Sequence, residues 1–442
     1  MKAFYRGIIV LVMAAFISEI FEFLVNVVLA RELGEMGMGL YMSILPSIFL
    51  VVIIASLELP VSVSKFIAEK EAQYHKSMLT HTFQLTILFT IVLMSAVTII
   101  FILVPVFQTY HPYIRWACIL LIPIISFSSI ARGYFMGLQK MSKIAISNLM
   151  RKIAQLLLLI IVFKLFQFQI ESAILIAICV FIGSELIVFL YLIHAYYLQA
   201  RNLKEKRGLS LRRKEVRDKL LAVSLPTTGM RIFHALTHAV KPFLIKSALL
   251  KAGLTATAAT EQFGMVAGVA LTIGFFPAFI AHSLLIMLIP TVSEAYAKKD
   301  LFKLQKLLQQ VMMLTFLYGV PAVFIFNIFA EPLTNLFFKS STASIYLQLL
   351  WPYFLVHFFV IPMQAFLIGL GLVKEAFLHS IWSTIISFSL IYIFGSSAQF
   401  GMYGVIIGMN TGGLLLLLMH YLTICKKINF SLILRRPVKH YD

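Results

Sequence analysis

Charged residues are scarce in this sequence, where they make up 12% of 442 residues against 61% hydrophobic residues. Soluble domains contain about 25% charged residues, so this composition excludes an ordinary soluble protein. Cysteine is rare as well. Cys118, Cys179 and Cys425 show no spacing typical of a disulfide framework or a metal site, and we expect all three to be buried apolar residues.

The sequence consists largely of long hydrophobic runs. A bilayer core about 30 Å thick needs about 20 apolar residues per helix, and runs without polar alternation indicate helices rather than a barrel. The first run, 8–30, is longer than the core of a signal peptide, so we expect it to remain as a span. We predict an all-α polytopic membrane protein of about twelve transmembrane helices, near 7–30, 40–64, 81–106, 113–136, 144–166, 170–198, 220–250, 262–292, 308–330, 344–370, 376–396 and 400–424.

The net charge of +19 is distributed over short loops between the runs, which argues against a nucleic-acid partner. Lys and Arg gather in every second loop, and cytoplasmic loops are the ones enriched in these residues. One set of loops includes Lys65, Lys140 and Lys298, whereas the other has little beyond Arg31, Lys251 and Lys339. This asymmetry predicts that both termini are cytoplasmic, which requires an even number of spans.

Two related halves are indicated by the layout. We predict a six-helix lobe over 1–198, a basic cytoplasmic linker over 199–219, a second six-helix lobe over 220–425 and a basic cytoplasmic tail over 426–442. Span 2 ends in LPVSVSKFIAEKEA and span 8 in MLIPTVSEAYAKKD, while span 4 ends in FMGLQKMSK and span 10 in LIGLGLVKE. Since each half has an even number of spans, the halves would be parallel repeats.

The segment 31–70, RELGEMGMGLYMSILPSIFLVVIIASLELPVSVSKFIAEK, resembles the stage V sporulation protein B family in its Gly-Leu-Tyr, Leu-Pro and Ser-Lys elements. The segments 132–155 and 264–299 resemble the same family. Three positions depart from its pattern, namely Glu58, Ser142 and the pair Arg151-Lys152. The resemblance places the chain in the multidrug/oligosaccharidyl-lipid/polysaccharide (MOP) exporter superfamily. It implies two six-helix lobes around a central cavity, alternating access and transport of lipid-linked sugars across the bacterial cytoplasmic membrane.

Ionisable groups inside a membrane are costly and therefore point to function. In span 7, Arg231, His234, His238 and Lys241 follow the spacing i, i+3, i+7, i+10, so they share one helix face. A positive face suits an anionic ligand such as a polyprenyl-linked diphosphate, which Arg can bind bidentately. A structural polar seam between helices, paired with carboxylates, is the other interpretation.

Two further groups are candidates. Glu19, Glu22 and Asn26 share a face of span 1, and the resemblance implies that spans 1 and 7 both border the cavity. These residues would pair with the span 7 cations as a gate, bind a coupling ion, or have a structural role only. Arg132 and Arg151 lie near the inner ends of spans 4 and 5, where they would either extend to the interface or receive a lipid phosphate at a cytoplasmic entrance.

A flippase for an anionic polyprenyl-linked oligosaccharide or a cell-wall or spore-cortex precursor, moving it from the inner to the outer leaflet, fits these features best. A cation-coupled multidrug antiporter is the alternative, although the only aspartates, Asp218, Asp300 and Asp442, all lie outside the spans. A polyprenyl-dependent membrane enzyme fits least, because acids are few in the outer loops and no nucleotide-binding motif is present. We expect a monomer in the bilayer, no catalytic residue, and no cofactor or metal. The energy source would be a gradient of an ion such as H⁺ or Na⁺, the membrane potential, or consumption of the product outside.

Overall fold

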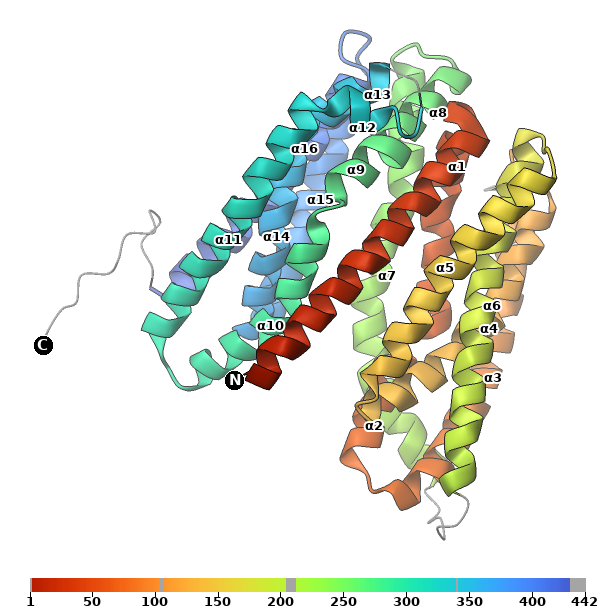
Figure 1. Cartoon of the computed structure of the whole chain (residues 1–442), viewed down its shortest axis with the longest axis vertical. Helices are drawn as coiled ribbons and strands as arrows, with labels where there is room; N and C mark the ends of the chain where they lie inside the picture. The colour runs from red at the N-terminus through yellow and green to blue at the C-terminus, as the bar shows by residue number, and fades with distance from the viewer. Residues whose placement is uncertain (1, 104–106, 204–211, 339–340, 430–442) are drawn as a thin grey trace, which may run out of the picture. The chain divides into compact units, whose positions relative to one another are not determined.

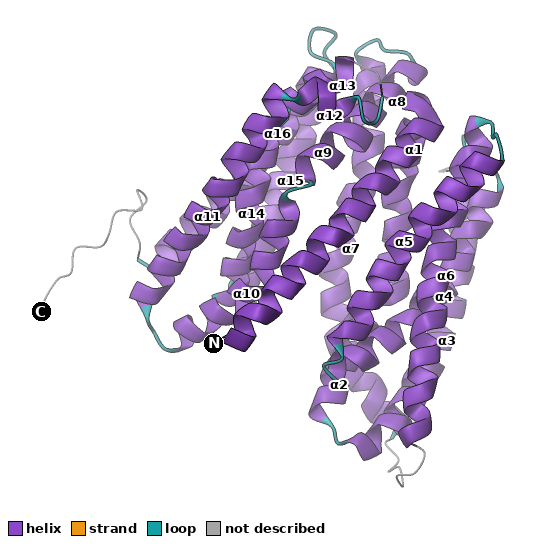
Figure 2. Cartoon of the chain, viewed as in Figure 1, coloured by secondary structure: helices purple, strands orange, loops and turns teal. Residues whose placement is uncertain are grey.

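The computed structural model describes residues 2–103, 107–203, 212–338 and 341–429. Every regular element among these residues is helical, and no strand occurs in this part of the chain (Figure 2). Helices satisfy their own backbone hydrogen bonds, which is the requirement that a hydrocarbon surrounding imposes. The all-α prediction is confirmed.

The chain forms two compact units, one of residues Leu40–Val240 and the other of Met1–Gly39 with Lys241–Asp442. Helix α7 runs without interruption through one change of unit, whereas α1 is kinked at Gly34, shortly before the other. The predicted lobe boundaries at 198 and 220 differ from these divisions and stay a prediction. The helices of the first seven elements are α1 (Lys2–Ser56), α2 (Leu59–Glu69), α3 (Ala72–Leu103), α4 (Tyr113–Gly137), α5 (Met141–Leu165), α6 (Ile170–Leu203) and α7 (Arg213–Lys251).

Within the unit Leu40–Val240, α4 is the central helix and packs against α2, α3, α5 and α6 (Figure 1). Its sequence allows this because Gly133 lies directly against α2. A Cβ atom at Gly133 would come within 2.7 Å of the Val63 Cβ and 2.9 Å of the Leu59 carbonyl oxygen. Small residues let membrane helices approach closely, so dispersion contacts replace the weak hydrophobic drive of a lipid surrounding.

The other unit contains the remaining elements, which are α8 (Ala256–Gly264), a π-helical turn (Met265–Ala270), α9 (Leu271–Phe275), α10 (Ala278–Ala297), α11 (Leu301–Ile328), α12 (Ala330–Thr334), α13 (Ser341–Leu349), α14 (Trp351–Gly369), α15 (Val373–Gly395) and α16 (Met402–Lys427). Here α15 and α16 lie side by side, and both pack against α14 (Figure 1). Gly404, Gly408 and Gly412 form the small-residue stripe of α16 that faces α15.

Eleven helices of the described residues are long and apolar enough to cross a membrane. The predicted spans 7–30 and 40–64 both overlap the first of them, Ala15–Glu69, which is kinked between them at Gly34. The predicted span 262–292 is divided between Ala256–Phe275 and Ala278–Ala297. The predicted span 220–250 lies on α7, which is not among the eleven and has several charged residues in its sequence. The orientation of the termini stays a prediction.

The predicted linker and the predicted tail are both described only in part. Helix extends into the predicted linker 199–219 from both sides, because the Lys, Arg, Glu and Leu residues of the linker favour helix. Residues 204–211 of the linker and residues 430–442 of the predicted tail lie outside the described residues. Cys118 and Cys425 are buried as expected. The prediction for Cys179 is wrong, because this thiol is exposed at the surface of α6. A thiol is only weakly polar, so its exposure to an apolar surrounding costs little free energy.

Candidate functional site

The predicted cationic face lies on one continuous helix, because α7 has no break between Arg231 and Lys241. The spacing of Arg231, His234, His238 and Lys241 therefore keeps the four side chains on one side of α7. His234 is half-buried, and Arg231 and His238 are exposed. Lys241 places its ammonium group 5.6 Å from the centre of the Tyr353 ring, a cation–π contact with α14.

Arg231 forms an ion pair with Glu58, through a hydrogen bond from the guanidinium Nη1 to the carboxylate Oε1. The two side chains differ strongly in exposure, with 56% for Arg231 and 7% for Glu58. In the sequence, Glu58 is only a departure from the family pattern. The sequence could have revealed Glu58 as a candidate site residue, because it is an acid within an otherwise apolar run, and such acids in membrane helices are usually functional.

Glu58 lies at a break in the second predicted span. Helix α1 ends at Ser56 and α2 begins at Leu59, with Pro60 in its first turn. Leu57 and Glu58 both adopt left-handed backbone conformations, with φ of 45° and 46°. Such conformations are unfavourable for residues other than glycine and occur where the surroundings enforce them, often at functional sites. The break turns the carboxylate of Glu58 toward α7.

A second polar contact joins the same two helices. The hydroxyl of Ser224 on α7 donates to the hydroxyl of Ser62 on α2 at 2.8 Å, and both side chains are buried. Together with the pair of Glu58 and Arg231, it links α2 to α7 at two points about two helical turns apart along α7. The polar face of α7 is thus held against the break in span 2.

The span 1 residues Glu19, Glu22 and Asn26 are all half-buried on α1. The amide of Asn26 donates to the backbone carbonyl of Glu22 at 3.1 Å, so part of its hydrogen bonding is used within its own helix. Glu22 and Arg231 belong to different compact units, and a contact between the span 1 acids and the α7 cations stays a prediction.

Arg132 and Arg151 are brought together by Glu185, a residue absent from the predicted site. The carboxylate of Glu185 lies 3.8 Å from Nη2 of Arg132 and 3.5 Å from Nε of Arg151. Arg132 also donates to the side-chain oxygen of Asn148 at 3.1 Å. Glu185 is buried on α6, and a lone acid in an apolar run of that helix could have revealed it. One carboxylate for two guanidinium groups leaves the cluster with a surplus positive charge.

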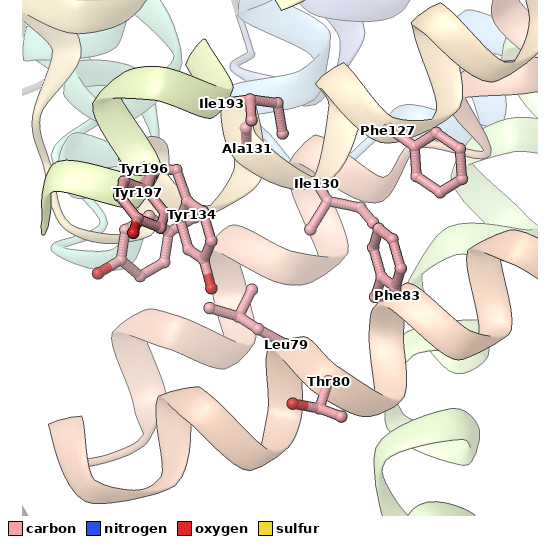
Figure 3. Close-up of a pocket in the computed structure, with 10 residues that line it drawn as sticks. All are labelled: Leu79, Thr80, Phe83, Phe127, Ile130, Ala131, Tyr134, Ile193, Tyr196 and Tyr197. Carbon is pink, nitrogen blue, oxygen red and sulfur yellow. The ribbon is translucent and has the colours of Figure 1, made fainter. Parts of the chain in front are cut away.

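An apolar cavity of about 360 Å³ lies among α3, α4 and α6 of the same unit. Figure 3 shows Tyr134, Tyr196 and Tyr197 on one side of it and Phe83 and Phe127 on the other. The hydroxyl of Tyr134 is buried and has no hydrogen-bond partner among the described residues. This lining can accommodate a hydrocarbon chain, but it offers no cation to a phosphate.

Sequence comparison decides the family. The profile of the polysaccharide biosynthesis protein family matches residues 4–279, and that of the MatE family matches residues 265–393. The chain belongs to the polysaccharide biosynthesis protein family of the MOP superfamily. It is 54% identical to sporulation protein YkvU of Bacillus subtilis (strain 168), over 98% of each chain. It is 31% identical to stage V sporulation protein B of the same organism, over 98% of this chain and 85% of the relative.

Solved structures of this superfamily share the fold. An inward-facing multidrug resistance MATE family transporter aligns with a TM-score of 0.72 at 16% identity, covering 93% of this chain and 94% of its own. A MOP superfamily transporter from Pyrococcus furiosus Vc1, for which a reverse polarity of the binding pocket suggests a different function, aligns with a TM-score of 0.65 at 17% identity, covering 98% and 97%. The predicted family and fold are confirmed, and the chain is a multi-pass bacterial membrane transporter related to sporulation and polysaccharide biosynthesis proteins.

Proposed function

We propose that the chain is a flippase for an anionic polyprenyl-diphosphate-linked sugar, a precursor of cell-wall or spore-cortex material, which it moves from the inner to the outer leaflet. The observation that carries this proposal is the exposed guanidinium of Arg231 on the cationic face of α7, whose Nη1 atom pairs with the buried carboxylate of Glu58. A guanidinium has five donors, so one nitrogen can bind Glu58 while others bind a diphosphate. The relationship to sporulation proteins supports the substrate class.

The pair of Glu58 and Arg231 would act as a latch on the broken helix. A diphosphate that approaches Arg231 competes with the carboxylate for the same cation, and the like charges of diphosphate and Glu58 repel each other. Release of Glu58 would leave a strained backbone at Leu57 and Glu58 without the ion pair that holds it. Substrate binding would thereby change the conformation of span 2, which is a step that alternating access requires.

The cluster of Arg132, Arg151 and Glu185 would receive the head group before it reaches α7. Its surplus positive charge attracts phosphate, and Glu185 keeps both guanidinium groups in place. The apolar cavity beside α4 offers a place for the polyprenyl chain of the same substrate. Head group and chain would then contact neighbouring parts of one unit.

The test uses the full-length protein in liposomes with a fluorescent polyprenyl-diphosphate sugar, scored by its appearance in the outer leaflet. We expect Arg231→Ala and Lys241→Ala to abolish this movement while the proteins still insert. Lys251→Ala is the matched control, since it removes the same kind of charge from the last turn of the same helix, about 160° around the axis from Arg231. Wild-type rates in both face variants would overturn the proposal.

A multidrug antiporter predicts a different result in the same liposomes. Cationic drugs would be exchanged for ions, and replacement of Arg231 would leave that exchange intact or increase it. Movement of a cationic drug without movement of the polyprenyl lipid would favour the antiporter.

A further inference from the structure

Two histidines that have no part in the site described above meet inside the bundle formed by α14, α15 and α16. His379 on α15 and His420 on α16 bring their Nδ1 atoms to 3.0 Å. Nε2 of His379 lies 3.3 Å from the hydroxyl of Thr423. His420 is 1% exposed, and its Nε2 has no hydrogen-bond partner among the described residues.

The geometry limits how protons are distributed over the pair. Two neutral imidazoles carry two N–H protons, and one of these must lie between the two Nδ1 atoms. If Nδ1 of His420 donates, His379 keeps its proton on Nε2 and donates it to Thr423, which leaves a bare lone pair on Nε2 of His420. The reverse arrangement leaves a buried N–H of His420 without an acceptor, and buried unpaired N–H groups are the rarer case. The pair therefore has an open proton acceptor.

The same count sets the capacity of the pair. One additional proton gives three N–H groups over four ring nitrogens, and the fourth nitrogen must stay bare because it accepts the bridging hydrogen bond. A second additional proton would break this bridge and place two cations side by side in a poorly solvated region. The site can thus hold one extra proton while its hydrogen bond persists.

The surroundings of the pair contain few charges. On α15, Glu375 lies one turn before His379 and interacts with it electrostatically, and Lys374 is exposed. On α16 the neighbouring titratable groups are Tyr421 and Cys425. At this end α14 contributes the apolar residues Met363, Phe366 and Leu367 to the core cluster. The α7 cation that contacts α15 is Lys251 at Tyr392, about three and a half turns from His379.

We propose that His379 and His420 form a binding site for one proton in this transporter, and that H⁺ is its coupling ion. The pair joins two helices of one bundle, so a change in its protonation changes the contact between α15 and α16. Burial disfavours an added positive charge at the pair, and the nearby carboxylate of Glu375 would offset part of that cost. Proton binding does not depend on the proposed function, whereas the coupling of that proton to lipid movement rests on it.

The first experiment counts protons taken up by the purified protein in detergent between pH 8 and pH 5. We expect the double variant of His379→Asn and His420→Asn to take up one proton fewer than the wild type, because the pair holds a single extra proton. Ser387→Ala, which changes α15 without removing a titratable group, is the control and should take up as many protons as the wild type. A double variant that loses two protons, or none, would overturn the proton site.

The second experiment uses liposomes with the fluorescent polyprenyl-diphosphate sugar and an imposed pH gradient. We expect the gradient to drive accumulation by the wild type, and His420→Asn to retain downhill movement without gradient-driven accumulation. Undiminished accumulation in His420→Asn would overturn the coupling. A wild type that shows the single-proton count but moves no lipid under any gradient would contradict the flippase and leave the proton site supported.

Discussion

The second and eighth predicted spans, which the sequence predicts to be equivalent, break at different places. Each has two prolines, Pro46 and Pro60 in one and Pro277 and Pro290 in the other. In span 2 the helix continues past Pro46 and breaks immediately before Pro60, whereas α10 begins after Pro277 and continues past Pro290. Proline removes a backbone hydrogen bond at each site but does not by itself decide which one becomes a break.

The residue two positions before the second proline distinguishes the two spans. It is Glu58 in span 2 and Leu288 in span 8, and both are 5% exposed. Leu288 belongs to a buried hydrophobic cluster and stays on a continuous helix. Glu58 must find a cation, and the left-handed turn at Leu57 and Glu58 directs it to Arg231. A buried charge thus accompanies the break, and an apolar residue accompanies the continuous helix.

The largest effect is expected from Leu288→Glu, which puts the acid of span 2 into span 8. The new carboxyl group would be buried in an apolar cluster without a cation, at a cost of about 3–5 kcal/mol. Thermal unfolding in detergent measures the loss. Leu288→Met is the control and should cost less than about 1.5 kcal/mol. If the two variants unfold at the same temperature, a buried acid is tolerated at position 288, and the difference between Glu58 and Leu288 does not explain why only span 2 breaks at this point.

Arg231→Met should destabilise the protein by about 2 kcal/mol, because it leaves the carboxylate of Glu58 buried without a partner. Glu58→Leu should cost less, since the exposed Arg231 can be solvated at the surface that it already occupies. The double variant should regain most of the stability and none of the lipid movement. Equal losses of stability in the two single variants would show that the difference in exposure between Arg231 and Glu58 does not decide the cost of removing either partner.

A feature shared by the two spans should respond equally in both. Gly133 faces Val63 and Leu59, and Gly369 faces Val292 and Ile289; a Cβ at either glycine would lie 2.7 Å from the valine Cβ. We expect Gly133→Ala and Gly369→Ala each to lose about 1–2 kcal/mol of stability from overpacking. Gly183→Ala, where the nearest atom is 3.9 Å away, is the control and should lose nothing. Loss in one repeat alone would contradict their equivalence.

The smallest effect is expected at the second contact between α2 and α7. Ser224→Ala removes the hydrogen bond to Ser62, and the remaining hydroxyl can still donate to a carbonyl of its own helix. The loss in thermal unfolding should be about 0.5–1 kcal/mol, with lipid movement unchanged. If Ser224→Ala lost as much lipid movement as Arg231→Ala, the hydrogen bond between Ser224 and Ser62 would be as important for transport as the ion pair, which would contradict this prediction.

Much of the fold was predictable because hydrophobic runs and loop charges are local properties. The spacing of Arg231, His234, His238 and Lys241 could be read as one face because α7 is continuous there. The partners could not be predicted in the same way. Glu58 and Arg231 are 173 residues apart, and Glu185 meets Arg132 from a different helix.

By itself, the sequence determined that this protein is a helical membrane protein with a cationic face on α7, since apolar length and charge placement follow directly from residue order, while its resemblance to a known family indicated transport. Tertiary structure decided which acid meets which cation, where span 2 breaks and that His379 meets His420. Those outcomes depend on packing between distant segments, where a buried charge or an unpaired ring nitrogen is stabilised only by the group that another helix brings to it.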